Sequence, residues 1–222
     1  NSFYALACSL LYKETSDNKW KFRSELATKT ELDNTRNRFH KIEMFRWEFK
    51  NYALLQIKKE NTLPSLHLSL SHRIKSMQNM GSFRANWMAM RGLNLLLRWK
   101  LYGKNIDLTQ SRLEIRKVLQ RQTPEGLFCD EVQDNSFQYH AYILALLTQY
   151  YDILPSPKLK SRIIKGLNIL VLITDPEGNS CYFGRGQQQI FGYASAIYAL
   201  CYAHKHFDKK FGPYAKLIYN YI

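Results

Sequence analysis

The sequence predicts an all-α fold built from α/α hairpin repeats, in which apolar inner helices alternate with amphipathic outer helices. Two observations carry this prediction: an internal repeat in the C-terminal half and a regular alternation between two kinds of helix. A continuous stack of such hairpins curves into an arc or closes into a ring. We therefore expect a single domain over residues 1–222 that forms an incomplete or partial (α/α) toroid.

The repeat is visible in two loops that share a Pro-Glu-Gly sequence followed by a cysteine. The first copy is Pro124-Glu125-Gly126 with Cys129, and the second, 52 residues later, is Pro176-Glu177-Gly178 with Cys181. At the same offset Tyr139 corresponds to Phe191, and His140 corresponds to Gly192. Repeats near this length are typical of stacked supersecondary units, each of which buries its apolar face against its neighbours.

The N-terminal part of the chain is less regular. Residues 3–12 predict the end of an apolar helix, and a polar connection is expected from Thr15 to Lys29. Apolar residues at helical spacing among many Lys and Arg predict a long, basic, amphipathic helix over 31–59. Pro64 ends this segment, because a residue before proline is disfavoured in the helical region. A helix is also favoured over 66–77.

The C-terminal part predicts the alternation most clearly. Apolar, aromatic helices are expected over 83–102, 136–152 and 188–206. Amphipathic helices are expected between them, one capped by Asp107 or Thr109 and ending before Pro124, the other beginning at Ser156-Pro157 and ending at Asp175. Gly212-Pro213 marks the turn into a last segment.

Helices that are apolar on nearly all sides must be buried, so these three form the inner layer. Their beginnings then lie on one face, where polar side chains from three separate segments converge. These candidate site residues are Arg84, Asn86 and Trp87; Asp134, Asn135, Tyr139 and His140; and Arg185, Gln187, Gln188 and Gln189.

The strongly basic composition restricts the class of partner. A formal net charge of +14 favours binding of polyanions such as acidic polysaccharide, nucleic acid or anionic lipid. Nucleic acid is the less favoured partner, because the sequence has no zinc-finger, RNP or clear helix-turn-helix pattern and its basic residues are spread along the chain. We expect an acidic polysaccharide or oligosaccharide as the ligand. The sequence leaves the oligomeric state open.

Several common kinds of site are not indicated. No apolar run reaches the ~18 residues of a membrane span, and no P-loop, Rossmann, G-x-S-x-G or H-E-x-x-H pattern is present. The cysteines lack metal-ligand spacing, and we expect no metal and no cofactor. Cys129 and Cys181 could pair if their loops meet, the alternative being free thiols. The chain begins at Asn1 rather than Met, as a processed or N-terminally truncated product would.

Two of these motifs carry a resemblance to a known group of enzymes. Asp134-x-x-x-x-Tyr139-His140 and Phe183-Gly184-Arg185-Gly186-Gln187 resemble motifs of α/α-toroid polysaccharide lyases of the heparinase II/III and alginate-lyase kind, over about residues 80–207. The Gly-Arg-Gly turn is also similar to that of toroid hydrolases of unsaturated uronides. The resemblance implies cleavage of a uronate polymer, and a periplasmic or secreted location.

β-Elimination from a uronate requires neutralisation of the substrate carboxylate, a base for the C5 proton and an acid for the leaving oxygen. Arginine and amide groups can neutralise the carboxylate and the developing enolate. Tyr139 and His140 are the candidates for proton transfer, with Arg185 as the third catalytic candidate. The remaining candidates would bind substrate. Alternatively, His140 is a hydrogen-bonded core residue and Trp87 packs in the core.

Two other functions remain open at this stage. A glycoside hydrolase would need two carboxyl groups, for which Asp130, Glu131 and Asp134 are available, together with Asp175 or Glu177 from the repeat-equivalent loop. A non-catalytic helical-repeat module that binds a polyanion would use the basic residues collectively, and its affinity would fall steeply with salt.

Overall fold

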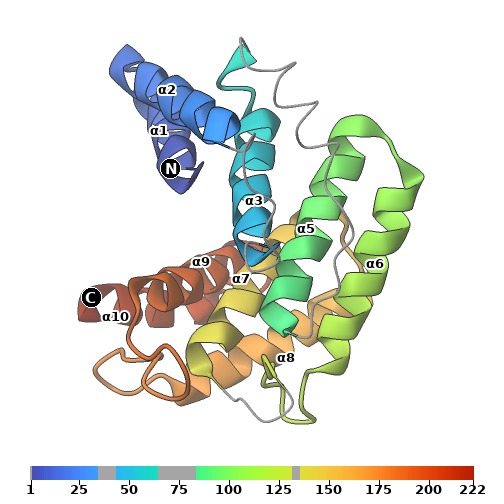
Figure 1. The fold of residues 1–222 in the computed structure, drawn as a ribbon. Coiled ribbons are helices and arrows are strands. Elements are labelled where there is room, and N and C mark those ends of the chain that lie inside the picture. Colours follow the sequence, from blue (N-terminus) through green and yellow to red (C-terminus); the bar gives the residue numbers. More distant parts are fainter. Residues whose placement is uncertain (1, 35–43, 65–83, 132–135) are drawn as a thin grey trace. The chain divides into compact units, whose positions relative to one another are not determined.

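A computed structural model describes residues 2–34, 44–64, 84–131 and 136–222, and the regular structure within these ranges is helical (Figure 1). The predicted all-α class is therefore confirmed. The helices are α1 (Ser2–Thr15), α2 (Asn18–Asn34), α3 (Met44–Glu60), α5 (Ala85–Tyr102), α6 (Asn105–Gln120), α7 (Phe137–Ile153), α8 (Pro157–Ile173), α9 (Ile190–His206), the 3-10 helix η3 (Lys209–Phe211) and α10 (Gly212–Tyr221). None of these helices is both long and apolar enough to cross a membrane.

The polar connection expected from Thr15 to Lys29 is wrong, because α2 runs through most of it. The Asp17 carboxylate accepts a hydrogen bond from the Lys19 N–H and so caps the first turn of α2. The buried face of α2 includes Ser24 and Thr28, and the Ser24 hydroxyl donates to the Ala5 carbonyl oxygen of α1. Small polar residues form this contact, so the hydrophobic periodicity that signals a helix is absent.

The predicted helix over 31–59 is described in two pieces, the end of α2 and the whole of α3, on either side of residues 35–43. The helix predicted over 66–77 lies outside the described residues. Helix α6 begins at Asn105 rather than at the expected cap, and Asp107 is instead a buried partner of Arg98, at 3.3 Å.

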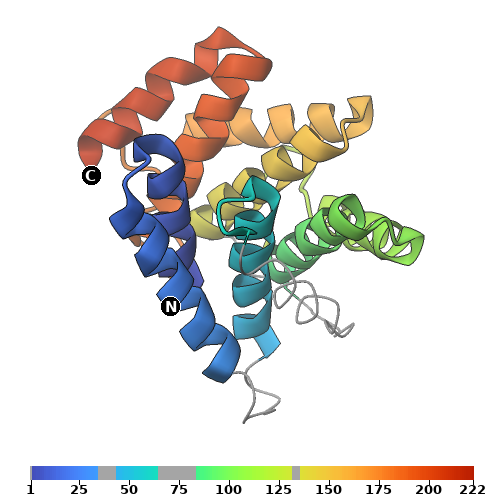
Figure 2. The same ribbon diagram turned by 90° about the horizontal axis from the view of Figure 1, so that it is seen from above.

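The chain divides into two compact units, and the division passes through α5 and α6. The first unit comprises Asn1–Gly81 and Asn94–Gln110. Within it α1 packs along α2 and against α3, and Figure 2 shows α1 and α2 side by side. The Ser9 and Thr62 hydroxyls form a buried hydrogen bond, which joins α1 to the segment after α3.

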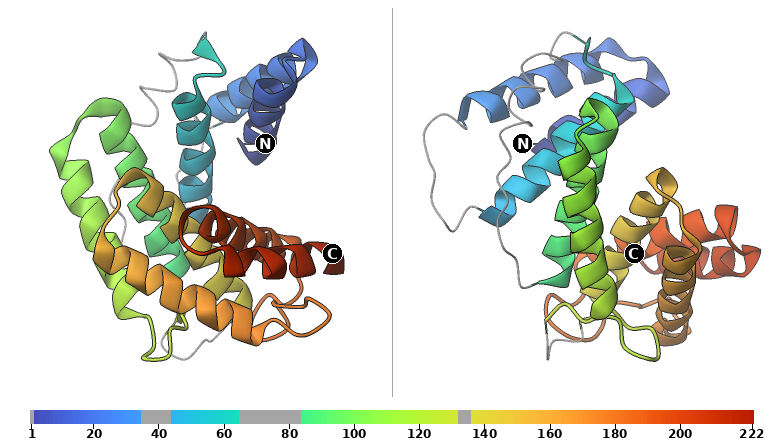
Figure 3. Two further views of the ribbon diagram at one scale, coloured as in Figure 1. Left: turned by 180° about the vertical axis from the view of Figure 1, so that it is seen from behind. Right: turned by 90° about the vertical axis from the view of Figure 1, so that its right-hand side faces the viewer.

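The second unit comprises Ser82–Leu93 and Ser111–Ile222. Helix α7 packs against both α8 and α9, and α9 packs against α10 (Figure 3). Helices α7 and α9 are 17 residues long and contribute the centre of the core. The core includes Ile143, Leu144 and Leu147 of α7, Leu167 and Leu170 of α8, and Ala196, Ala199 and Leu200 of α9.

The internal repeat is present in the backbone of this second unit. Thr123 N–H donates to Leu127 O and Gly126 N–H to Thr123 O; 52 residues later, Asp175 N–H donates to Asn179 O and Gly178 N–H to Asp175 O. Gly126 and Gly178 have φ of +125° and +101°, which favour glycine. A Cβ on Gly126 would lie 2.7 Å from the Lys165 carbonyl oxygen, and one on Gly178 2.4 Å from that of Leu217. Each turn therefore packs directly on the following outer helix.

Candidate active site

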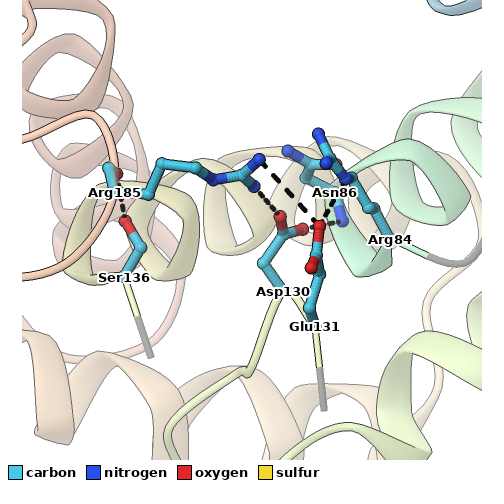
Figure 4. A network of polar contacts seen from close by, with 6 residues as sticks. All are labelled: Arg84, Asn86, Asp130, Glu131, Ser136 and Arg185. Carbon is cyan, nitrogen blue, oxygen red and sulfur yellow. Dashed lines mark hydrogen bonds and ion pairs between the residues drawn. The ribbon is translucent and has the colours of Figure 1, made fainter. Parts of the chain in front are cut away.

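Asp130 is the buried centre of the candidate site, in the loop before α7 (Figure 4). One carboxylate oxygen accepts the Asn86 N–H at 3.0 Å, and the Asp130 carbonyl oxygen accepts the Ala85 N–H at 2.9 Å. These are donors of the first turn of α5, which have no partner within the helix, and a negative charge is favourable at this end. Asp130 is fully buried, and its two hydrogen bonds fix the beginning of α5.

Arg185 reaches this carboxylate from the loop before α9. Gly184 and Gly186 have φ of +86° and +74°, so the backbone turns sharply on both sides of the arginine. The loop is bonded to the start of α7, since Phe137 N–H donates to the Phe183 carbonyl oxygen at 3.1 Å and the Ser136 hydroxyl donates to the Arg185 carbonyl oxygen at 2.8 Å. The beginning of α7 therefore holds the backbone of Arg185 in place.

The Arg185 guanidinium group contacts both a carboxylate and an aromatic ring. Its Nη2 is 2.7 Å from the second carboxylate oxygen of Asp130, and its central carbon is 4.7 Å from the centre of the Tyr139 ring. The hydrogen-bonded ion pair and the cation–π contact together restrict the orientation of the group.

A second ion pair lies beside the first. Glu131 Oε1 is 2.5 Å from Arg84 Nε and 3.9 Å from Arg185 Nη1. The Arg84 guanidinium is 5.2 Å from the centre of the Trp87 ring. The structure therefore brings together Arg84, which directly precedes α5, Asn86 and Trp87 of α5, Tyr139 of α7 and Arg185 of the loop before α9, as the predicted convergence of the inner-helix beginnings requires.

The end of the glutamine loop is bonded to a residue that the sequence did not single out. Gln138 is fully buried, its amide oxygen accepts the Gln189 N–H at 3.3 Å, and a Cβ on Gly186 would lie 2.4 Å from its amide nitrogen. Gln187, Gln188 and Gln189 are themselves exposed beside Arg185. Asp134 and Asn135 lie outside the described residues.

His140 is placed differently from the expectation that it transfers protons. Its side chain is fully buried, Nδ1 accepts the Phe128 N–H at 3.0 Å, and Nε2 donates to the Gly166 carbonyl oxygen at 3.0 Å. Burial lowers its pKa from 6.5 to about 4, and the hydrogen bond to Gly166 only partly opposes this effect. Both ring nitrogens are occupied by backbone, so His140 joins the loop before α7 to α8 as a neutral core residue.

The other acidic and sulfur groups have local roles. An Asp175 carboxylate oxygen accepts the Asn179 N–H at 2.7 Å within its own turn, and Glu177 is exposed. Cys129 and Cys181 are free thiols, in agreement with the alternative to a disulfide. Among the residues that the structure describes, no cluster of three His, Cys, Asp or Glu side chains could hold a metal ion.

Aromatic side chains continue the site beyond Arg185. The Phe191 ring centre lies 6.0 Å from that of Tyr139 and 5.6 Å from that of Tyr142. Phe183 is 53% exposed, and its ring centre is 5.3 Å from that of Phe137. Partly exposed rings beside a charged group are suited to contact the apolar face of a sugar.

No protein-family profile and no curated protein sequence matches this chain. Solved structures do match. A glycoside hydrolase of family 105 from C. acetobutylicum ATCC 824 superposes with a TM-score of 0.73 at 12% identity, covering 97% of this chain and 74% of that one. The chain has the α/α-toroid fold.

Two further structures show the same fold. A polysaccharide lyase superposes with a TM-score of 0.71 at 13% identity, covering 99% of this chain and 75% of that one. The unsaturated glucuronyl hydrolase of Bacillus sp. GL1, described as responsible for the degradation of glycosaminoglycan, superposes with a TM-score of 0.70 at 12% identity, covering 98% of this chain and 71% of that one. At such low identity the likeness concerns the fold alone.

Proposed function

We propose that this protein is a carbohydrate-active enzyme that binds a uronate-bearing saccharide with the uronate carboxylate at Arg185. One observation carries the proposal: the guanidinium group is held in a fixed orientation by the buried Asp130 and the Tyr139 ring. A cation that is already oriented can bind a carboxylate, and the enolate formed from it, with little reorganisation. Proteins of the same fold named as uronyl hydrolase and polysaccharide lyase support this substrate class.

For the reaction we favour metal-independent β-elimination, with Tyr139 in place of the buried His140 as the proton-transfer group. As the base, the Tyr139 oxygen would take the proton from C5, the C4–O bond would break as the C4=C5 double bond forms, and the same oxygen would return the proton to the leaving oxygen. Arg185 would neutralise the carboxylate and the developing enolate. Tyr139 is half-buried against this arginine, so both groups would act on the same sugar ring.

Hydrolysis is the second candidate, and the carboxyl groups of the loop before α7 favour it. Hydrolysis at a glycosidic carbon commonly uses two carboxyl groups on opposite sides of the bond. Asp130 is occupied by Arg185 and by the first turn of α5, which leaves Glu131 and Asp134 as the pair on this loop. The solved structures of the same fold include hydrolases as well as a lyase.

One set of assays separates these reactions. A panel of uronate polymers and of oligosaccharides with unsaturated ends is incubated with the protein, and ultraviolet absorbance of the conjugated double bond is followed together with reducing ends. Elimination raises the absorbance, and hydrolysis of unsaturated ends lowers it. Binding without either change, and a steep loss of affinity with added salt, would indicate the non-catalytic polyanion-binding module instead.

The residue assignment has its own test. Tyr139→Phe removes only the hydroxyl, so we expect the rate of elimination to fall by about 100- to 10,000-fold, the usual contribution of acid–base catalysis. Tyr219→Phe on α10, whose side chain is 67% exposed, is the matched control. A Tyr139→Phe protein with the wild-type rate would exclude Tyr139 as the proton-transfer group, and an Arg185→Gln protein with wild-type uronate affinity would exclude the proposed carboxylate site.

A further inference from the structure

Two adjacent carboxylates contact Arg185, and they differ in how firmly they are held. Asp130 is fully buried, and both of its carboxylate oxygens are hydrogen-bonded, one to Arg185 and one to the Asn86 N–H. The Glu131 side chain is 42% exposed, and its Oε1 lies between Arg84 Nε and Arg185 Nη1 (Figure 4). Asp130 is therefore a permanent counter-ion, whereas Glu131 is in contact with solvent and can leave.

The distances make the contact between Glu131 and Arg185 the weaker of the two. At 3.9 Å from Nη1 the Glu131 oxygen is beyond hydrogen-bond range, so this contact is electrostatic only. Its bond to Arg84 is short, but the Arg84 side chain is 37% exposed, and ion pairs between solvated groups contribute little stability. A second carboxylate of suitable geometry could take its place at small cost.

We propose that Glu131 occupies the position of the substrate carboxylate in the ligand-free protein and competes with an acidic sugar for Arg84 and Arg185. The inference rests on the proposed binding of a uronate at Arg185. A uronate replaces one carboxylate with another, so both arginines keep a counter-ion. A neutral sugar carries no charge that could compete for the arginines, so it leaves Glu131 in place.

The proposal predicts that removal of the competing charge strengthens the binding of a uronate. In Glu131→Gln the side chain keeps its size and loses its charge, so Kd for glucuronate should fall by about three- to fivefold, as expected for loss of a partly solvated ion pair. Kd for glucose should not change. Glu177→Gln, an exposed glutamate in the repeat-equivalent turn, removes the same charge elsewhere and should leave both values at those of the wild type.

The experiment measures Kd for glucuronate and for glucose by calorimetric titration or ligand-observed NMR of the full chain. The proteins compared are the wild type, Glu131→Gln, Glu177→Gln and Arg185→Gln. Weaker or unchanged glucuronate binding by Glu131→Gln, or an equal gain in Glu177→Gln, overturns the role of Glu131 and leaves the proposed function intact. If glucuronate binding is undetectable in all four proteins, or is unaffected in Arg185→Gln, the carboxylate site itself is refuted, and with it the proposed function.

Discussion

Replacement of His140 provides the sharpest test of how the second unit is packed, because the hydrogen bonds of the two His140 ring nitrogens can be removed separately. His140→Asn places an amide oxygen near the position of Nδ1 and can still accept the Phe128 N–H, whereas His140→Gln places an amide nitrogen near Nε2 and can still donate to the Gly166 carbonyl. His140→Gln leaves the buried Phe128 N–H without a partner, and His140→Asn removes the side-chain hydrogen bond to the Gly166 carbonyl oxygen of α8. We expect each to lower the free energy of unfolding at neutral pH by about 1–3 kcal/mol.

The pH dependence of the free energy of unfolding supplies a second, independent test of the buried His140. The folded protein lowers the pKa of His140 from 6.5 to about 4, so between these values the unfolded chain binds a proton that the folded chain does not. The contribution of His140 to stability is therefore fully present above the unfolded pKa and is lost as the pH falls toward the folded one. From these two pKa values the free energy of unfolding should fall by about 2 kcal/mol between about pH 7.5 and about pH 5.

The free energy of unfolding is measured by urea unfolding at the two pH values. Circular dichroism and tryptophan fluorescence are recorded together, and the two unfolding transitions should coincide. Amides do not titrate, so the pH-dependent loss should be present in the wild type and in His206→Gln, which alters an exposed histidine of α9, and absent from both His140 variants. Identical pH dependence in all four proteins would refute the structural role. Full stability combined with loss of activity in a His140 variant would instead restore His140 as a proton-transfer group.

Three further predictions concern the site, the repeat and the thiols. Asp130→Asn keeps an acceptor for the Asn86 N–H but loses the charge beside Arg185, so glucuronate affinity should fall, with a stability loss of only about 1–2 kcal/mol in urea unfolding because Arg185 is partly solvated; unchanged affinity would contradict the positioning role. Gly178→Ala should lower the free energy of unfolding more than Gly103→Ala does, since both have positive φ but only Gly178 lies against a carbonyl oxygen; equal losses would argue against the turn packing on α10. In the native protein an alkylating reagent should modify Cys201, which is exposed, well before Cys181, because burial raises the pKa of the Cys181 thiol to about 11; mass spectrometry of native and urea-unfolded samples checks the order.

How well each helix could be predicted from the sequence depends on the range of the interactions that form it. Helices α7 and α9 were predicted almost to the residue, because dense apolar and aromatic composition and the preceding turns are local signals. The start of α8 was predicted for the same reason: Ser156 caps the helix by accepting the Leu159 N–H, and Pro157 takes the first helical position. Helix α2 was missed because its contact with α1 includes small polar residues whose burial depends on the partner helix.

In the candidate site, too, local features were predicted and long-range contacts were missed. The sequence placed Arg84, Tyr139 and Arg185 at the beginnings of inner helices, and the structure brings them together. It did not reveal that Asp130 joins two of these helix beginnings, although its carboxyl group was noted for hydrolysis, because the pairing with Arg185 spans 55 residues. Gln138 and Ser136 were not recognised, because their burial is decided by the loop before α9; the only local sign is an amide directly before Tyr139 in a mainly apolar helix.

By itself, then, the sequence determined the helical class, the repeat in the C-terminal half and the segments that carry the polar side chains, since propensity, periodicity and capping act over a few residues. Only the tertiary structure decided which of those side chains face a ligand and which complete the core. Tyr139 and His140 are neighbours in the chain, but one contacts the guanidinium group of Arg185 and the other is enclosed by the backbone of Phe128 and Gly166. That difference depends on the groups that surround each position, which distant segments supply only when the chain folds.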